Sequence, residues 1–169
     1  MELVLLRHGP AAVRDPARWR DDARRPLTSA GKSAVREAAE GLATLGVKRP
    51  TIRTSPAVRA ADTARIAGEV LGASGPIQRW EELKYGSTAE SVVQRLVQEG
   101  PRSGTIVLVG HEPGLGQLAG LLLFGEPLAP LRLRRAGAAM IAVSQRVGPS
   151  AGRLEWALTR GQLAGLGKL

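Results

Sequence analysis

Cysteine is absent from this chain of 169 residues. Its absence excludes disulfide bonds, thiolate zinc sites, and any phosphatase or protease whose nucleophile is a thiolate. Aromatic residues are scarce, with three Trp, one Tyr and one Phe, so a base-stacking surface for single-stranded nucleic acid is poorly supplied. No apolar stretch reaches the roughly 18 residues that a membrane-spanning helix needs. The sequence therefore predicts a protein without a membrane partner.

A secretory leader is not expected either. Glu2 stands before a short apolar run, with no basic residues ahead of it and no small-residue cleavage site behind it, so we expect a cytoplasmic protein. No internal repeat is present, and glycine and proline are spread evenly along the chain. A single domain over residues 1–169 is the organisation that this length and pattern favour.

The net charge is +9, and most of the cations are arginine. Arginine offers a planar fork that matches carboxylate and phosphate oxygens, and a positive field attracts anionic partners such as phosphorylated proteins, small phosphate esters or nucleic acid. For most of these arginines, exposure on solvated faces is sufficient explanation. The basic loop 10–26 either borders the substrate entrance or is solvated surface. The second is favoured except for Arg25, which we expect near a functional pocket because Pro26 and Leu27 follow it.

Apolar periodicity predicts strands alternating with helices. Strands are expected at residues 2–6, 51–54, 77–80 and 105–110, and an antiparallel pair at 138–144 and 153–159. Helices are expected from the Thr28 cap to Leu45, from Pro56 to Leu71, at 89–99, and from Pro113 to Phe124, with one helical turn near Trp19 and a frayed tail at 161–169. This alternation predicts an α/β fold, a three-layer α/β/α sandwich with a mostly parallel central sheet.

Both histidines of the chain directly follow an all-aliphatic strand. His8 comes after LVLL with Arg7 beside it, and His111 comes after TIVLVG. Ligands of open α/β sheets collect beyond the carboxyl ends of the strands, so these side chains are expected at one edge. Gly9 would let the backbone approach a ligand closely.

A second cationic feature follows the strand at 51–54. Ser55 and Pro56 are expected to open a helix whose N–H groups, together with Arg59, favour an anion at the same edge. Glu81 and Glu82 follow the strand at 77–80. Each feature alone has a structural explanation, such as a capped turn or a solvated charge, but their coincidence at one edge favours a functional site.

Metal binding is disfavoured, because no HExxH pair is present and the histidines have arginines as neighbours. The glycines around GHEPGLGQLAG do not form a GxGxxG or Walker motif, so nucleotide binding is not indicated.

Taken in order, LLRHG, TSPAVRAADTA, EEL with KYG, and VGHEPGL resemble the histidine phosphatase superfamily, which has the phosphoglycerate mutase-like fold. The resemblance extends from Glu2 to about Leu163, and the short RRPLTSAG segment is most similar to the SixA-type phosphohistidine phosphatases. It implies that His8 is the nucleophile and that Arg7, Arg59 and His111 form the phosphate pocket. Glu82 matches the position of a proton donor in many members.

The implied reaction is metal-independent and needs no cofactor. A transferring phosphoryl group is stabilised by positioned donors: Arg7 and Arg59 supply forks, and His111 is expected to be protonated. His8 should attack as a neutral imidazole, with its other ring nitrogen held by a backbone carbonyl. Gly9, Arg25 and Ser55 are predicted as further substrate-binding residues.

The substrate is predicted to be phosphohistidine in a protein. A small sugar or nucleotide phosphate is the alternative, and a non-catalytic module that binds anions or nucleic acid is a weaker one. Mutase activity is disfavoured because the segment between Arg59 and Glu82 leaves little chain for a lid. Pro10 departs from the polar residue that many relatives carry there, which removes one backbone donor.

Overall fold

The computed structural model describes residues 1–100, 104–143 and 146–169. Its centre is a six-stranded sheet in the order β3-β2-β4-β1-β5-β6. The first four strands in chain order are β1 (Glu2–Arg7), β2 (Thr51–Thr54), β3 (Gln78–Arg79) and β4 (Thr105–Gly110). They pair in parallel, whereas β5 (Ala138–Val143) and β6 (Gly152–Leu158) extend the sheet in antiparallel pairing. The prediction of a mostly parallel sheet is confirmed.

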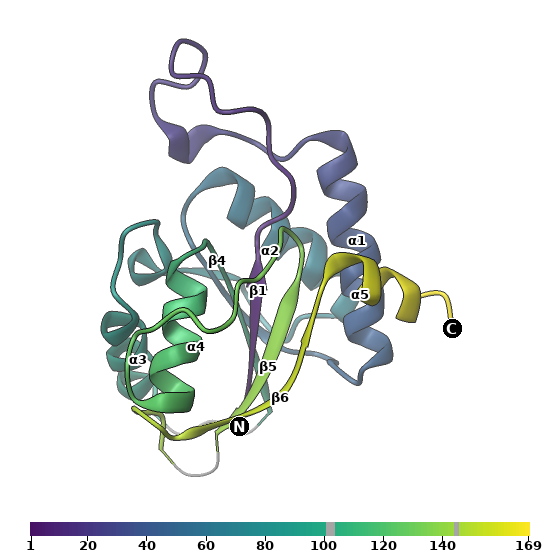
Figure 1. Ribbon diagram of the computed structural model, residues 1–169. Helices are drawn as coiled ribbons and strands as arrows, with labels where there is room; N and C mark the ends of the chain where they lie inside the picture. Colours follow the sequence, from purple (N-terminus) through teal and green to yellow (C-terminus); the bar gives the residue numbers. More distant parts are fainter. Residues whose placement is uncertain (101–103, 144–145) are drawn as a thin grey trace.

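Helices cover both faces of the sheet, as the three-layer prediction required. One layer contains α1 (Ser29–Thr44), α2 (Val58–Leu71) and α5 (Arg160–Leu166), and the other contains α3 (Ala89–Gln98) and α4 (Gly114–Phe124) (Figure 1). Alternate side chains of β1 enter the two cores. Val4 and Leu6 lie in the core that includes α1 and α2, and Leu3 and Leu5 lie in the core that includes α3 and α4. A strand buried on both faces has no polar alternation, which explains its continuous apolar run.

Several boundaries differ from the sequence-based expectation. Helix α2 begins at Val58, so Pro56 lies before the helix. Strand β3 covers only residues 78–79 of the expected 77–80, and a 3-10 helix, η2 (Glu81–Leu83), follows it. Ser144, expected at the end of a strand, lies outside the described residues.

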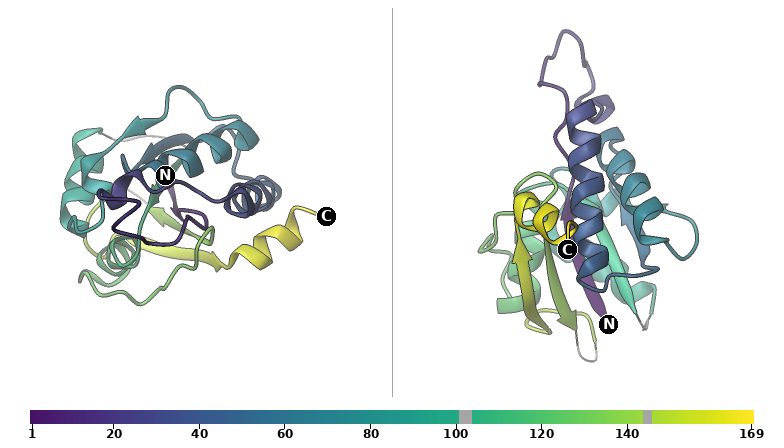
Figure 2. Two further views of the ribbon diagram at one scale, coloured as in Figure 1. Left: turned by 90° about the horizontal axis from the view of Figure 1, so that it is seen from above. Right: turned by 90° about the vertical axis from the view of Figure 1, so that its right-hand side faces the viewer.

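The expectation of a frayed C-terminal tail is wrong. Residues 160–166 form α5. The helix begins at a capping box, in which the Thr159 side chain accepts from the Gln162 N–H and the Gln162 side chain accepts from the Thr159 N–H. Leu163 is fully buried in the core that α1 and α2 share. Gly41 of α1 permits this close packing, because a Cβ there would lie 2.1 Å from the carbonyl oxygen of Leu163. Figure 2 shows α5 beside α1 in both views.

Residues 10–26 form an arm that extends beyond the layered body (Figure 1, top). Its base is closed by a bridge between Ala11 and Leu27 and by a hydrogen bond from the Ala12 N–H to the Pro26 carbonyl. The predicted turn near Trp19 is present, since its N–H donates to the Asp15 carbonyl. A second 3-10 helix, η1 (Asp22–Arg24), follows it.

Among the described residues, no helix combines the length and apolarity that crossing a membrane requires. The cytoplasmic location stays a prediction.

Candidate active site

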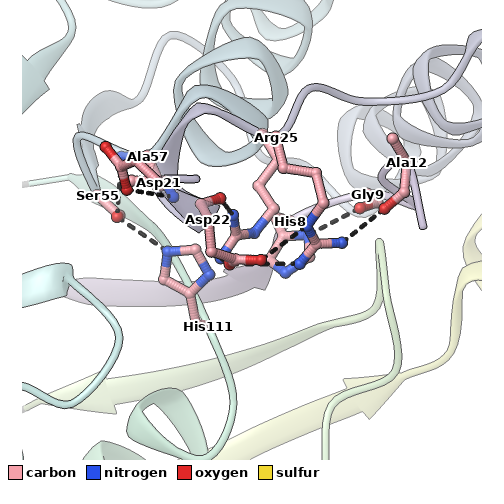
Figure 3. Close-up of polar contacts among 11 residues, drawn as sticks. His8, Gly9, Ala12, Asp21, Asp22, Arg25, Ser55, Ala57 and His111 are labelled. Atoms are coloured by element: carbon pink, nitrogen blue, oxygen red, sulfur yellow. Dashed lines mark hydrogen bonds and ion pairs between the residues drawn. The ribbon is translucent and has the colours of Figure 1, made fainter. Parts of the chain in front are cut away.

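The two histidines lie together because β1 and β4 are neighbouring parallel strands. Arg7 pairs with Gly110 at their carboxyl ends, and the His8 N–H donates to the Gly110 carbonyl. The next residue on each strand is a histidine, and the two ring centroids are 5.0 Å apart. The carboxyl edge of the sheet, where the sequence predicted both histidines, therefore brings together two imidazoles that are 103 residues apart in the sequence (Figure 3).

His8 is held in one tautomer. Its Nδ1 lies 2.7 Å from the Gly9 carbonyl oxygen, and because a carbonyl only accepts, Nδ1 must carry the proton and Nε2 the lone pair. Burial lowers the pKa of His8 to about 3, and the nearby His111, Arg59 and Arg7 lower it further while the Gly9 bond opposes the shift. The expected neutral imidazole and its carbonyl partner are both confirmed.

Gly9 serves packing rather than direct ligand contact. A Cβ at Gly9 would lie 2.5 Å from Val35 Cγ2 on α1, so a side chain there would force α1 away from β1. The Gly9 N–H donates to Thr63 Oγ1 at 3.1 Å. That donor is already used within the protein, so a substrate-binding role for Gly9 is not supported.

Arg7 and Arg59 come from the first and second βα units of the chain and line one cavity with both histidines. Arg7 ends β1, and its Nη1 donates to the Leu133 carbonyl at 2.8 Å. Arg59 is the second residue of α2, and its side chain is only 6% exposed. The Nε atoms of both arginines are buried without a partner in the described part of the chain.

Ser55 positions His111 instead of contacting the cavity. Its hydroxyl is fully buried, lies 2.9 Å from His111 Nε2 and accepts from the Ala57 N–H. The hydroxyl keeps its own proton and a second acceptor position, so it can either donate to Nε2 or accept from it. When it donates, His111 Nδ1 carries a proton; among the described atoms that nitrogen is buried without a partner.

The structure does not support the expected protonation of His111. Burial, with the positive charges of Arg59, Arg7 and Arg25, lowers its pKa to about 4, and Asp22 only partly opposes this. The arginines were expected there, but burial, the largest cause of the shift, could not be judged from the local sequence. A neutral His111 still donates through Nδ1 when Ser55 donates to Nε2.

A cavity of about 370 Å³ lies above the two histidines. The residues that line it are Arg7, His8, Arg14, Asp22, Arg25, Arg59, Tyr85, His111, Glu112 and Arg135. Arg25 is thus near the pocket, as expected. Glu82 is not part of this lining; it borders a separate hollow of about 10 Å³ that His111 also lines.

Two carboxylates of the cavity were not anticipated. Asp22 of η1 makes ion pairs with Arg25 and Arg59, both at 3.0 Å. Burial opposes its ionisation, but the hydrogen bond from Arg25 and the charge of Arg59 outweigh burial and lower the pKa of Asp22. Asp22 lies in the loop 10–26, which was predicted mainly as solvated surface and has no apolar periodicity. The neighbouring RRPLT segment was the only sequence signal for a functional residue there.

Glu112 is the second of these carboxylates. Its Oε1 accepts from the Leu133 N–H at 3.0 Å, and the Leu133 carbonyl in turn holds Arg7. Burial raises the pKa of Glu112, although the Leu133 bond and the charge of Arg7 oppose this. Its position directly after His111 was the signal available in the sequence.

Both histidines make the folded state less stable in acid. The unfolded chain takes up protons on these groups below pH about 6.5, whereas the folded chain resists until about pH 3 for His8 and 4 for His111. The unfolded state therefore binds more protons between these values, so the free energy of unfolding should fall as pH drops from about 6.5 toward 4.

Urea unfolding at a series of pH values measures this effect. We expect the His8→Gln/His111→Gln double variant to show a flatter dependence on pH over that window than the parent chain. An identical slope in both proteins would show that the imidazoles are not the groups responsible.

No three His, Cys, Asp or Glu side chains within the described ranges are grouped so that they could hold a metal ion.

A family model and a known protein are both similar to this chain in sequence. Residues 3–90 match the model of the Histidine phosphatase superfamily (branch 1). An uncharacterized protein of Picosynechococcus sp. is 36% identical over 137 residues, which is 81% of this chain and 82% of that protein.

Solved structures with the same fold include the protein histidine phosphatase SixA complexed with tungstate, with a TM-score of 0.81, 25% identity and coverage of 96% of this chain and 99% of that one. A mycobacterial glucosyl-3-phosphoglycerate phosphatase complexed with inorganic phosphate has a TM-score of 0.68 and 20% identity, covering 94% of this chain and 98% of its own.

Proposed function

The chain belongs to the histidine phosphatase superfamily and is a SixA-like phosphatase, and we propose that it hydrolyses protein phosphohistidine through a phosphoryl intermediate on His8. One observation carries the site assignment. Arg7 Nε, Arg59 Nε and His111 Nδ1 are buried nitrogens without partners among the described residues, and all three residues line one cavity with His8. Buried donors without acceptors are costly unless a ligand supplies the acceptor, and phosphoryl oxygens are suitable acceptors.

The proposed reaction has two steps. In the first, the lone pair of His8 Nε2 attacks phosphorus, the bond to the substrate's leaving group breaks, and that group takes up a proton from solvent as it departs. In the second, water attacks the phosphorus and gives a proton to solvent, the N–P bond breaks, and inorganic phosphate leaves with His8 restored. Arg7, Arg59 and His111 would donate to the equatorial oxygens as charge spreads over them. The donors and nucleophile come from this chain alone.

The leaving group distinguishes the two classes of substrate. An imidazole leaving group has a pKa of about 6.5 and departs protonated without a dedicated acid, whereas an alkoxide requires one. Glu82 lies outside the cavity lining, which supports phosphohistidine as the substrate. The cations also fit a protein partner with acidic groups: Arg14 and Arg135 line the cavity and make no ion pair within the described chain.

A phosphate ester is the second candidate, and Glu112 is the observation that favours it. Glu112 lines the cavity with a raised pKa, as a general acid requires. The solved mycobacterial relative is named as a phosphatase of glucosyl-3-phosphoglycerate. Parallel assays on a phosphohistidine protein and on p-nitrophenyl phosphate, in the presence of chelator, test the proposed function. Turnover of the ester alone would replace the first candidate with the second.

Replacing Glu82 with glutamine is expected to leave turnover of a phosphohistidine protein within roughly threefold of the parent, because its leaving group needs no acid. Glu81→Gln is the matched control, since Glu81 is the exposed neighbour in η2 and pairs with Lys84. The measurement is kcat on the phosphoprotein. A loss of about a hundredfold in Glu82→Gln alone would indicate general acid catalysis and an ester substrate.

A further inference from the structure

Asp22 occupies the donors that a phosphoryl group would need. Both terminal nitrogens of Arg59 are engaged by this one residue: Nη1 donates to the Asp22 carbonyl at 2.7 Å, and Nη2 lies 3.0 Å from its carboxylate. Arg25 donates to the same carboxylate through Nε at 3.0 Å. Figure 3 shows the Asp22 side chain beside Arg25, between His8 and His111. A carboxylate therefore lies among the cations of the phosphate pocket.

We propose that Asp22 is a specificity-determining residue: its carboxylate competes with the phosphoryl group for Arg59 and Arg25, and so disfavours small phosphates that have no other contact with the protein. This inference rests on the proposed function, because it takes the cavity to be the phosphoryl site. A large substrate would offset the competition through further contacts with the cavity rim. Free phosphate, the product, would not.

The arm that carries Asp22 has few polar contacts with the body of the protein. Beyond its base at residues 10–12 and 25–28, the polar contacts from the arm to the body of the protein, within the described ranges, are those between Asp22 and Arg59. The remaining side-chain bonds of the arm, such as those of Asp15 and Asp21, stay inside it. When an anion takes Arg59, the polar contact that joins η1 to α2 is lost.

Competition by Asp22 predicts the direction in which the affinity for phosphate changes when the charge of Asp22 is removed. A ligand that must first displace a closed state binds more weakly in proportion to the population of that state. Removing the negative charge of Asp22 weakens the closed state and also removes the repulsion between two anions in one cavity. The opposite role is a brace, in which Asp22 orients Arg59 for the phosphoryl group. Removal of a brace would weaken anion binding.

Calorimetric titration with inorganic phosphate separates the two roles. We expect the Kd for phosphate of Asp22→Asn to be lower than that of the parent by roughly tenfold or more. Asp21→Asn is the matched control: Asp21 is the adjacent carboxylate, accepts from the Ala23 N–H and makes no ion pair within the described chain. Its charge acts on Arg59 only through space, so the Kd for phosphate of this variant should fall much less than that of Asp22→Asn. An unchanged or higher Kd in Asp22→Asn would overturn the proposal. Asp22→Ala provides a second variant for the same titration. Circular dichroism of each variant shows whether it is folded.

A kinetic comparison tests discrimination itself. In Asp22→Asn, kcat/KM for p-nitrophenyl phosphate should rise relative to kcat/KM for a phosphohistidine protein, and inhibition by phosphate should strengthen. Tighter phosphate binding with an unchanged ratio would contradict the specificity role. Failure of the parent protein to hydrolyse phosphohistidine would reject the proposed function, but the phosphate titration would still report on Asp22.

Discussion

His8→Ala should lower kcat on a phosphohistidine protein by roughly four orders of magnitude or more, because the group that forms the covalent intermediate is removed. The effect is expected to be this large because the neutral Nε2 of His8 has no substitute in the cavity. His111 is 5.0 Å away, but its Nε2 is committed to Ser55 and its Nδ1 carries the proton in the arrangement described above. Residual turnover is measured with the same substrate at high enzyme concentration.

Trapping of the intermediate identifies the nucleophile directly. Acid-labile, base-stable phosphate should appear on the parent protein and be absent from His8→Ala. The His111→Asn variant is the informative comparison, since it removes a donor and keeps the nucleophile, so label should still form at a lower rate. Label that survives in His8→Ala and disappears in His111→Asn would reverse the assignment.

Arg7→Ala is expected to reduce kcat/KM by roughly a hundredfold to a thousandfold, the usual cost of losing one preorganised donor to a developing charge. Arg7 is fixed at the end of β1 by the Leu133 carbonyl, and Glu112 holds the Leu133 N–H. Its guanidinium is therefore positioned before substrate binds. Arg7→Lys should recover little of the loss, because a lysine lacks the planar fork and cannot make the same pair of contacts.

Arg65→Ala is the control for this variant. Arg65 lies on α2, pairs with Glu69 and is 55% exposed, so its loss removes the same charge from the chain without touching the cavity. Steady-state kinetics of Arg7→Ala, Arg7→Lys and Arg65→Ala should separate the local contact from net charge. Equal losses in Arg7→Ala and Arg65→Ala would show that overall charge, and not the fork, is responsible.

The layers of the fold and the meeting of the two histidines were predictable because they follow from simple patterns. Apolar runs such as LVLL mark strands buried on both faces, and parallel strands place their carboxyl ends at one edge. These rules also placed Arg7 and Arg59 near the histidines. The sequence therefore placed the cavity at the carboxyl edge of the sheet, although it did not determine that β1 and β4 are neighbours in that sheet.

Other parts of the site could not be predicted, because they depend on contacts across long separations. Asp22 and Arg59 are 37 residues apart, and the η1 helix that presents Asp22 is too short to leave a periodic signal. Ser55 was predicted to bind substrate, and the contact of its hydroxyl with His111, which follows another strand, could not be predicted for a related reason. The low pKa of His111 likewise depends on burial, which local sequence does not report.

The pairing of Arg7 with Gly110 in neighbouring strands has a practical consequence. A slip of one residue between β1 and β4 would send alternate side chains to the opposite face of the sheet, and the two imidazoles would no longer face one another. A chain refolded in the wrong alignment could keep its strand content and still be inert. Regain of catalysis after dilution from urea would thus count only correctly aligned molecules, which far-ultraviolet dichroism cannot do.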